Sequence, residues 1–221
     1  MKLKGHIIFL LLFAYFNAFT QNTENPFFND ILRFKEIDKI LPPPQDAILL
    51  IGSSSFTMWQ DVQEYFPEFI IINRGFGGST LVDQIRYVED IVFPYSPKQI
   101  IIYCGENDLA SSDTINSEIV IQRFRILFDL IRAKFPDVMI SYISMKPSPL
   151  RWHLSKEFRE ANKGIQNFIE SKSNANFINI WDNMLDTNFM PDKSMFLEDR
   201  LHMNPKGYII WQKAIESLLV N

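Results

Sequence analysis

The chain has a single cysteine, Cys104, so no disulfide can form within it and the fold must be held by packing. It also lacks any cluster of cysteines and histidines at metal-ligand spacing, so neither a metal nor a cofactor is expected. Residues 75–80 resemble a P-loop but have no lysine, and Phe56 takes the second glycine position of a G-x-S-x-G elbow. No low-complexity segment or internal repeat is present. We therefore expect one packed domain that is neither a P-loop protein nor an α/β-hydrolase with the G-x-S-x-G elbow.

The chain has no surplus of positive charge. Its 22 basic and 26 acidic side chains give a net charge of −4. Removal of residues 1–20 would take away two lysines and no acid, which leaves a net charge of −6. A negative balance argues against nucleic acid or an anionic membrane surface as the main partner. The length suits one domain with a sizeable core.

The first twenty residues have the order of a secretory signal peptide. Lys2 and Lys4 precede an apolar run at 7–16, and a more polar segment follows. The run is too short for a comfortable membrane span, although an uncleaved N-terminal anchor is the alternative. We expect cleavage near Thr20 and export of the mature chain to the periplasm or the medium, without stable membrane insertion. The oligomeric state is left open.

The rest of the chain alternates between strand-like and helical patterns. Residues 21–45 are expected to form an N-terminal helix, capped at Asn25 and running to about Ile40, and a Pro-rich connection. The apolar side of this helix is expected at Phe27, Phe28, Ile31, Leu32 and Ile37. Five strands are expected at 47–51, 69–73, 99–104, 138–145 and 177–181.

Helices are expected between and after these strands. They lie at 58–66, from about 80 to 92, at 119–135, at 154–168 and from 205 onward. Thr80 with Asp83 forms a capping box, and Asn204-Pro205 is an N-cap followed by proline at the first helical position. The alternation predicts an α/β fold, a three-layer α/β/α sandwich with a five-stranded parallel sheet in flavodoxin-like order.

Polar residues follow several of these strands and gather at one edge of the predicted sheet. Ser54 follows the first strand, Gly78 the second and Asn107 the third, while Asp199 and His202 precede the last helix. Acyl transfer by serine needs a base, a group that orients the base, and donors for the oxyanion. His202 suits the base and Asp199 the orienting carboxylate. The backbone N–H groups of Ser54 and Gly78 and the Asn107 amide suit the donors.

Four segments resemble the conserved blocks of the SGNH or GDSL-type esterases and acylhydrolases. They are Gly-Ser-Ser at 52–54, Asn-Arg-Gly-Phe-Gly-Gly at 73–78, Gly-Glu-Asn-Asp at 105–108 and Asp-Arg-Leu-His at 199–202. The segment 201–208 is also similar to the family's ending, and the resemblance assigns 46–221 to one SGNH hydrolase domain.

The resemblance implies roles for five residues. Ser54 is the nucleophile of a triad with His202 and Asp199, and Ser54, Gly78 and Asn107 form the oxyanion hole. The family often has aspartate where Ser53 stands, which makes Ser53 and Ser55 rival nucleophiles. Each residue also has a structural reading: Ser54 as a helix cap, Asn107 as a turn former, and Asp199 with His202 as a surface pair.

The substrate is expected to be a carboxylic ester, either of a small molecule or of carbohydrate. Removal of short acyl groups such as acetyl from carbohydrate fits an exported member with short loops. Lysophospholipase or thioesterase action on longer chains is one alternative, and a catalytically silent carbohydrate-binding domain is another. The expected substrate-binding residues are Arg74, Phe76, Arg151 and Trp152, and Phe56 and Trp59 are further rim candidates, with core packing the default for Trp59.

Overall fold

The computed structural model describes residues 26–220, and a single parallel sheet lies at its centre. The strand order is β2-β1-β3-β4-β5, which confirms the predicted flavodoxin-like arrangement. The strands are β1 (Ile48–Gly52), β2 (Ile71–Gly75), β3 (Gln99–Tyr103), β4 (Met139–Ile143) and β5 (Ala175–Ile178). The expected signal peptide and the Asn25 cap lie outside the described residues.

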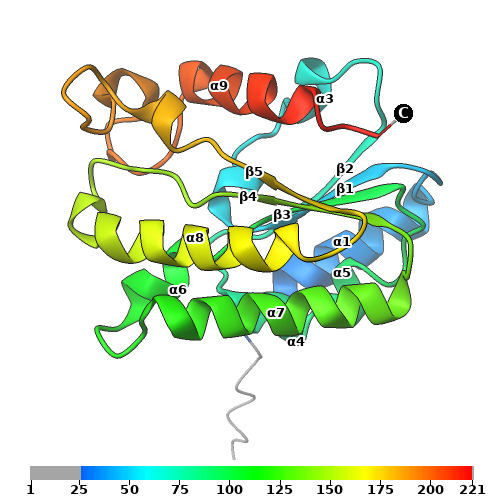
Figure 1. Ribbon diagram of the computed structural model, residues 1–221. Helices are drawn as coiled ribbons and strands as arrows, with labels where there is room; N and C mark the ends of the chain where they lie inside the picture. The colour runs from blue at the N-terminus through cyan, green and yellow to red at the C-terminus, as the bar shows by residue number, and fades with distance from the viewer. Residues whose placement is uncertain (1–25, 221) are drawn as a thin grey trace, which may run out of the picture.

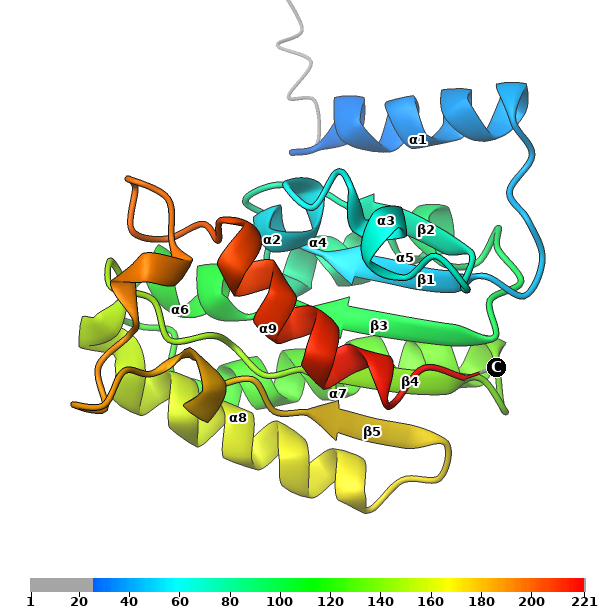
Figure 2. The same cartoon turned by 90° about the horizontal axis from the view of Figure 1, so that it is seen from above.

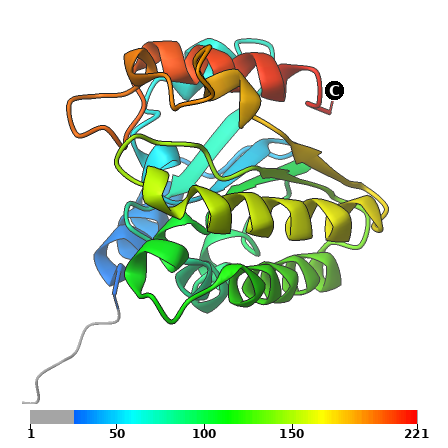
Figure 3. The same cartoon turned by 60° about the vertical axis from the view of Figure 1, so that its left-hand side comes forward.

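Helices cover both faces of the sheet and give the predicted three layers (Figures 1 and 3). One face carries α1 (Phe28–Ile40), α4 (Leu81–Arg86), α5 (Val88–Ile91), α7 (Ser117–Lys134) and α8 (Ser155–Glu170). The other carries α3 (Val62–Tyr65) and α9 (Pro205–Glu216). Two short helices, α2 (Ser54–Thr57) and α6 (Glu106–Ser111), directly follow β1 and β3. Three short 3-10 helices complete the fold: η1 (Trp152–Leu154), η2 (Asp182–Met184) and η3 (Lys193–Met195).

The carboxyl ends of the strands point to one side of the molecule. Figure 2 shows α2, α6 and the segment before α9 on that side. In the sheet register Gly52 pairs with both Gly75 and Tyr103, so β1, β2 and β3 end level with one another. Gly52 adopts φ +146°, and a Cβ there would lie 2.0 Å from the Tyr103 carbonyl oxygen. Only glycine therefore permits the sharp turn that follows β1.

Two apolar cores hold the layers together. In α7 the predicted inner face is confirmed, because Val120, Phe124, Leu127, Phe128 and Ile131 are all buried. On the opposite face an aromatic cluster of Phe56, Trp59, Tyr103, Tyr208 and Trp211 fills the space beneath α9. Trp59 stacks on Tyr208 at 4.7 Å between ring centroids, and Tyr103 meets Trp211 edge-on at 4.5 Å.

The predicted caps of two helices are confirmed. Thr80 and Asp83 form a reciprocal capping box at the start of α4. The Asn204 side chain accepts a hydrogen bond from the Lys206 N–H, and Pro205 is the first residue of α9. Both caps fix helices that begin next to the carboxyl edge of the sheet.

Three helices differ from expectation. The buried face of α1 is Ile31 and Phe34, whereas Phe28, Leu32 and Ile37 are at least one-third exposed. Helix α1 contacts the core only through a narrow strip of its surface. Its apolar residues occur on several sides of the helix, so the sequence pattern does not single out that strip. Of the helix expected at 58–66 only α3 forms, and a separate turn, α2, precedes it, because Trp59 turns between them into the aromatic cluster. The helix expected from 80 to 92 is interrupted at Tyr87, which has non-helical dihedral angles and packs edge-on against Phe76.

Candidate active site

The structure brings Ser54, His202 and Asp199 together at the carboxyl edge of the sheet. His202 Nε2 lies 2.9 Å from Ser54 Oγ, and His202 Nδ1 lies 2.6 Å from Asp199 Oδ2. Ser54 is the first residue of α2, directly after the turn at the end of β1. The imidazole can therefore accept the serine proton on one nitrogen while the carboxylate holds its other nitrogen.

Asp199 is fixed by its own connection. Its Oδ1 accepts the backbone N–H groups of Leu201 and His202, each at 2.9 Å. Arg200, between Asp199 and Leu201, has φ +62°, a left-handed conformation that folds the segment back on itself. Burial raises the pKa of Asp199, but hydrogen bonds from the imidazole and the two N–H groups outweigh burial and lower the pKa to about 2. The carboxylate is therefore charged at neutral pH.

Three hydrogen-bond donors converge beside Ser54. Among residues 26–220 the backbone N–H groups of Ser54 and Gly78 have no hydrogen-bond partner. Gly78 adopts φ +84°, which an L-residue rarely does. The Asn107 side chain donates one N–H from Nδ2 to the Ser79 carbonyl at 2.9 Å, which leaves its other Nδ2 hydrogen for a ligand. These donors can surround an oxyanion formed at a carbonyl attacked by Ser54.

The neighbouring serines have other surroundings. Ser53 and Ser55 are 5% and 2% exposed, whereas Ser54 is half-buried. Ser55 Oγ lies 3.3 Å from the buried Lys146 ammonium, and the Ser53 carbonyl accepts hydrogen bonds from the first turn of α2. Of the three serines, Ser54 is the one that meets the imidazole.

Cys104 lies just behind the site and is 1% exposed, as expected for a small buried residue. Burial and the nearby Asp108 carboxylate raise the pKa of its thiol well above the ordinary value. The thiol is neutral and shielded from solvent, so it is unsuited to act as a nucleophile.

A buried charged cluster adjoins the site, and the sequence pattern did not reveal it. Glu106 accepts hydrogen bonds from Lys146 Nζ at 3.0 Å and from Arg151 at 3.2 Å, and the Tyr103 hydroxyl also donates to it. Glu106 and Lys146 are 4% and 2% exposed. Burial raises the pKa of Glu106, but the two cations outweigh burial and lower the pKa below its ordinary value. Only the spatial pairing of residues forty positions apart identifies this cluster.

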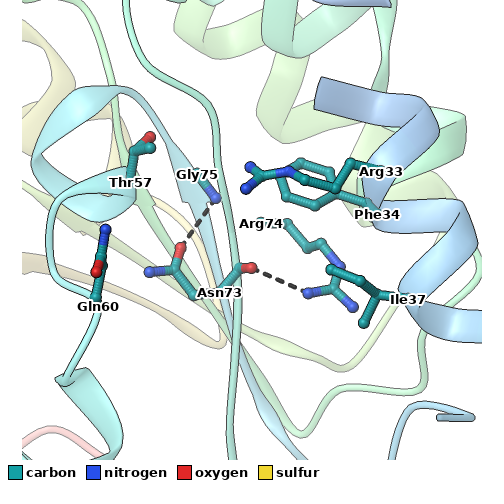
Figure 4. Close-up of a pocket in the computed structure, with 8 residues that line it drawn as sticks. All are labelled: Arg33, Phe34, Ile37, Thr57, Gln60, Asn73, Arg74 and Gly75. Carbon is teal, nitrogen blue, oxygen red and sulfur yellow. Dashed lines mark hydrogen bonds between the residues drawn. The ribbon is translucent and has the colours of Figure 1, made fainter. Parts of the chain in front are cut away.

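Two of the expected substrate-binding residues lie outside the pocket that contains Ser54. Arg74 is 9% exposed, and its guanidinium pairs with Asp38 of α1 and bonds Tyr95 and the Asn73 carbonyl. Figure 4 shows this side chain directed toward α1. Phe76 is fully buried and packs edge-on against Phe27 and Tyr87. The interpretation of Phe76 as a rim residue is wrong, because its ring is part of the core. Arg74 ties the β2 edge to α1 and also lines a hollow beside that helix, so its substrate-binding role stays a prediction.

Of the other rim candidates, only Arg151 lines the pocket that contains Ser54. Phe56 and Trp59 are fully buried in the aromatic cluster, so Phe56 is a core residue and Trp59 has its default core position. Trp152 stacks on Trp181 at 6.1 Å between centroids and packs against the core, outside the wall of the Ser54 pocket. Arg151 does line that pocket and donates to the Asn107 Oδ1 at 2.8 Å.

Two neighbouring hollows lie on this side of the molecule, and one of them contains Ser54. The first, of about 380 Å³, contains the candidate catalytic groups. Its walls are Ser54, Thr57, Met58, Gly77, Gly78, Asn107, Arg151, Leu201 and His202. The second, of about 400 Å³, lies between α1 and the segment after α2 (Figure 4). Thr57 borders both hollows, so they are neighbours on the surface.

A serine, an imidazole and a carboxylate in hydrogen-bonded series, on the carboxyl edge of a parallel sheet, define the class of serine-dependent hydrolases. The family model described as "GDSL-like Lipase/Acylhydrolase family" matches residues 52–210, which include every candidate catalytic residue. The chain belongs to this family and is a hydrolase. No curated protein matches the chain.

Solved structures have the same fold. A GDSL-like lipase from Bacteroides thetaiotaomicron is 19% identical with a TM-score of 0.73, and the match covers 85% of this chain and 96% of that one. An acetyl-xylooligosaccharide esterase variant from Geobacillus Stearmophilus is 15% identical with a TM-score of 0.63, over 80% and 95% of the two chains. A family 3 carbohydrate esterase from Clostridium thermocellum is 15% identical with a TM-score of 0.60, over 79% and 97%. None of the helices among residues 26–220 has the length and apolar character to span a membrane.

Proposed function

We propose that the protein is an exported serine esterase that removes short acyl groups, such as acetyl, from carbohydrate. The observation that carries the chemistry is the series of contacts from Ser54 Oγ through the His202 imidazole to Asp199, at 2.9 and 2.6 Å. Such a series raises the nucleophilicity of a serine without a metal or cofactor.

The reaction proceeds in two steps. Ser54 Oγ attacks the ester carbonyl while His202 Nε2 takes its proton, and the three N–H donors bind the oxyanion. The imidazolium then protonates the departing alcohol, which leaves an acyl group on Ser54. Water attacks this acyl-enzyme with His202 again as base, and the carboxylic acid is released with regeneration of the serine. Asp199 stays ionised throughout and stabilises the imidazolium.

The lining of the first hollow supports a small acyl group. Most of the surface of this hollow is apolar, which suits the methyl of an acetyl group, but Met58 and Leu201 are the only large apolar side chains among its nine lining residues and do not form an extended channel for a long acyl chain. Lysophospholipase or thioesterase activity on long chains is therefore the weaker alternative.

The second hollow supports a large polar alcohol. Arg33, Gln60, Thr57 and Asn73 place a guanidinium, two amides and a hydroxyl around it, beside the ring of Phe34 (Figure 4). Mixed donors and acceptors of this kind suit the hydroxyl groups of a sugar. Two similar structures are those of carbohydrate esterases, which agrees with this choice.

The first test is labelling of the purified protein with a fluorophosphonate, followed by peptide mapping. We expect one adduct on Ser54 that is lost in His202→Ala and retained in Ser194→Ala, a control that removes an exposed hydroxyl from a nearby loop. No adduct on the folded protein would refute the esterase and favour the catalytically silent carbohydrate-binding domain.

The second test measures substrate preference. We expect p-nitrophenyl acetate to be cleaved faster than esters with acyl chains of eight or more carbons, and acetylated xylo-oligosaccharide to release acetate. Arg33→Ala with Gln60→Ala should raise KM for the oligosaccharide and leave the aryl acetate unchanged. Faster cleavage of long-chain esters would overturn the carbohydrate assignment in favour of the lipid one.

A further inference from the structure

One loop that carries no proposed catalytic residue contacts the segments of Ser54, of Asn107 and of Asp199 with His202. This is the 146–151 loop, Lys-Pro-Ser-Pro-Leu-Arg, which follows β4. Lys146 Nζ lies 3.3 Å from Ser55 Oγ in the nucleophile helix, and Arg151 donates to Asn107 at 2.8 Å. The Leu150 N–H donates to the Arg200 carbonyl at 3.0 Å, within the segment that carries Asp199 and His202.

The Arg151 contact determines which end of the Asn107 amide faces the substrate. The guanidinium can only donate, so it requires the amide oxygen, and it holds that oxygen at 2.8 Å. At the other end the Ser79 carbonyl can only accept, and it takes one hydrogen of Nδ2 at 2.9 Å. The two contacts together exclude the flipped amide and leave the second Nδ2 hydrogen aimed at the oxyanion.

Arg151 is itself held by the buried charges beneath it. Glu106 Oε2 accepts from Arg151 at 3.2 Å, while Lys146 bonds both oxygens of Glu106 and is fully covered. The Lys146 backbone N–H also faces Glu106, at 3.3 Å. A buried ion pair often adds little net stability, because desolvation offsets the attraction. Its geometric effect here is specific, since it fixes the fork of Arg151 against Asn107.

We propose that Arg151, anchored by Glu106 and Lys146, is a positioning residue that orients the Asn107 amide for the oxyanion. The proposal rests on the proposed esterase function. Loss of the Arg151 side chain would act through Asn107 and would weaken binding of the transition state more than binding of the ester. Lysine at 151 would not replace it, because one ammonium cannot form the planar fork that joins Glu106 and Asn107.

The central experiment is a double-mutant cycle on aryl acetate hydrolysis. Arg151→Ala should lower kcat about 10- to 100-fold with KM changed less than threefold, a smaller loss than the 10²–10³-fold expected for removing the donor in Asn107→Ala. In the double variant the loss should equal that of Asn107→Ala alone, because Arg151 then has no amide to orient. Additive losses would mean that Arg151 acts directly on the substrate and would overturn the proposal.

Guanidinium rescue provides an independent readout. Guanidinium chloride at concentrations well below those that unfold the protein should partly restore kcat of Arg151→Ala, with no gain for Asn107→Ala. Arg159→Ala, which removes an exposed arginine from α8, should have wild-type kcat and no response. If Arg151→Ala fails to fold, Arg151→Lys takes its place, and a wild-type kcat for that variant would refute the fork.

The two levels of failure can be told apart. If the wild-type protein neither hydrolyses esters nor reacts with a fluorophosphonate, the proposed function is wrong. If the wild type reacts and folded Arg151→Ala retains its kcat, only the positioning role is wrong.

Discussion

Asp199→Asn is the most informative single substitution, because the structure decides how the new amide must lie. In the native protein Oδ1 accepts two backbone N–H groups at 2.9 Å, and Oδ2 accepts the His202 Nδ1–H at 2.6 Å. Asparagine has only one oxygen to offer. If that oxygen stays with the two N–H groups, the amide NH2 faces Nδ1 and forces the proton onto Nε2.

The size of the effect follows from these contacts. The alternative amide orientation would abandon two hydrogen bonds, each contributing about 1 kcal/mol. The inactive tautomer is therefore favoured by about 2 kcal/mol, or about 30-fold. Loss of the carboxylate charge beside the imidazolium adds to this, although water screens the 46% exposed side chain. The corresponding change in serine proteases lowers kcat about 10⁴-fold, and we expect about 10²- to 10³-fold here.

The assay is kcat for p-nitrophenyl acetate at pH 8, with urea unfolding to establish that the variant is folded. Asp186→Asn is a matched control. Asp186 Oδ1 also accepts two backbone N–H groups, at 2.8 and 3.0 Å, but the Asp186 carboxylate makes no hydrogen bond with a histidine among the described residues. It should reproduce any loss of loop stability and keep full activity. A kcat of Asp199→Asn within threefold of wild type would refute the tautomer argument.

Three further predictions follow from other features. Gly78→Ala should lower kcat about tenfold, because φ +84° costs an L-residue about 1–2 kcal/mol and relief of this strain would turn the Gly78 N–H away from the oxyanion; the added Cβ would meet only Phe27 at 3.9 Å, so the packing around it stays intact, and an unchanged kcat would count against the Gly78 donor. Trp211→Ala should reduce the free energy of unfolding in urea by about 3–5 kcal/mol, and a loss below 1 kcal/mol would contradict the aromatic core. Because the pKa of Asp199 is lowered to about 2, its share of stability is present above about pH 4 and lost as the pH falls through 2. The advantage in unfolding free energy of wild type over Asp199→Asn should thus shrink as the pH falls from 4 through 2, and an advantage that stays constant over that range would refute the assignment.

The sequence predicted the fold well because local and global signals agree. Continuous apolar runs such as 100–103 mark strands buried on both faces, and the Thr80 and Asn204 caps place helix starts to the residue. The inner face of α1 was predicted only in part, with Phe27 and Ile31 correct and Phe34 missed, because apolar residues occur on several sides of the helix and tertiary contact selects among them.

The candidate site was predictable in its polar residues and less so in its walls. Ser54, Asn107 and His202 stand directly after strands or before a helix, where the topology alone brings them to one edge. Arg74 and Phe76 occupy the same kind of position, yet one side chain turns to α1 and the other into the core. Proximity to a strand end does not determine which way a side chain points, and no short-range pattern links Lys146 to Glu106.

The order of the segments along the chain has a consequence for biosynthesis. The Ser54 to His202 hydrogen bond joins residues 148 positions apart, and α9, which packs over the sheet beneath it, ends at Glu216. A growing chain thus presents Ser54, Gly78 and Asn107 long before His202 has been made. Under the proposed mechanism hydrolysis begins only once Asp199 and His202 have been added and have folded back onto Ser54, so a nascent chain stopped at residue 195 should be inert however much of the sheet has formed.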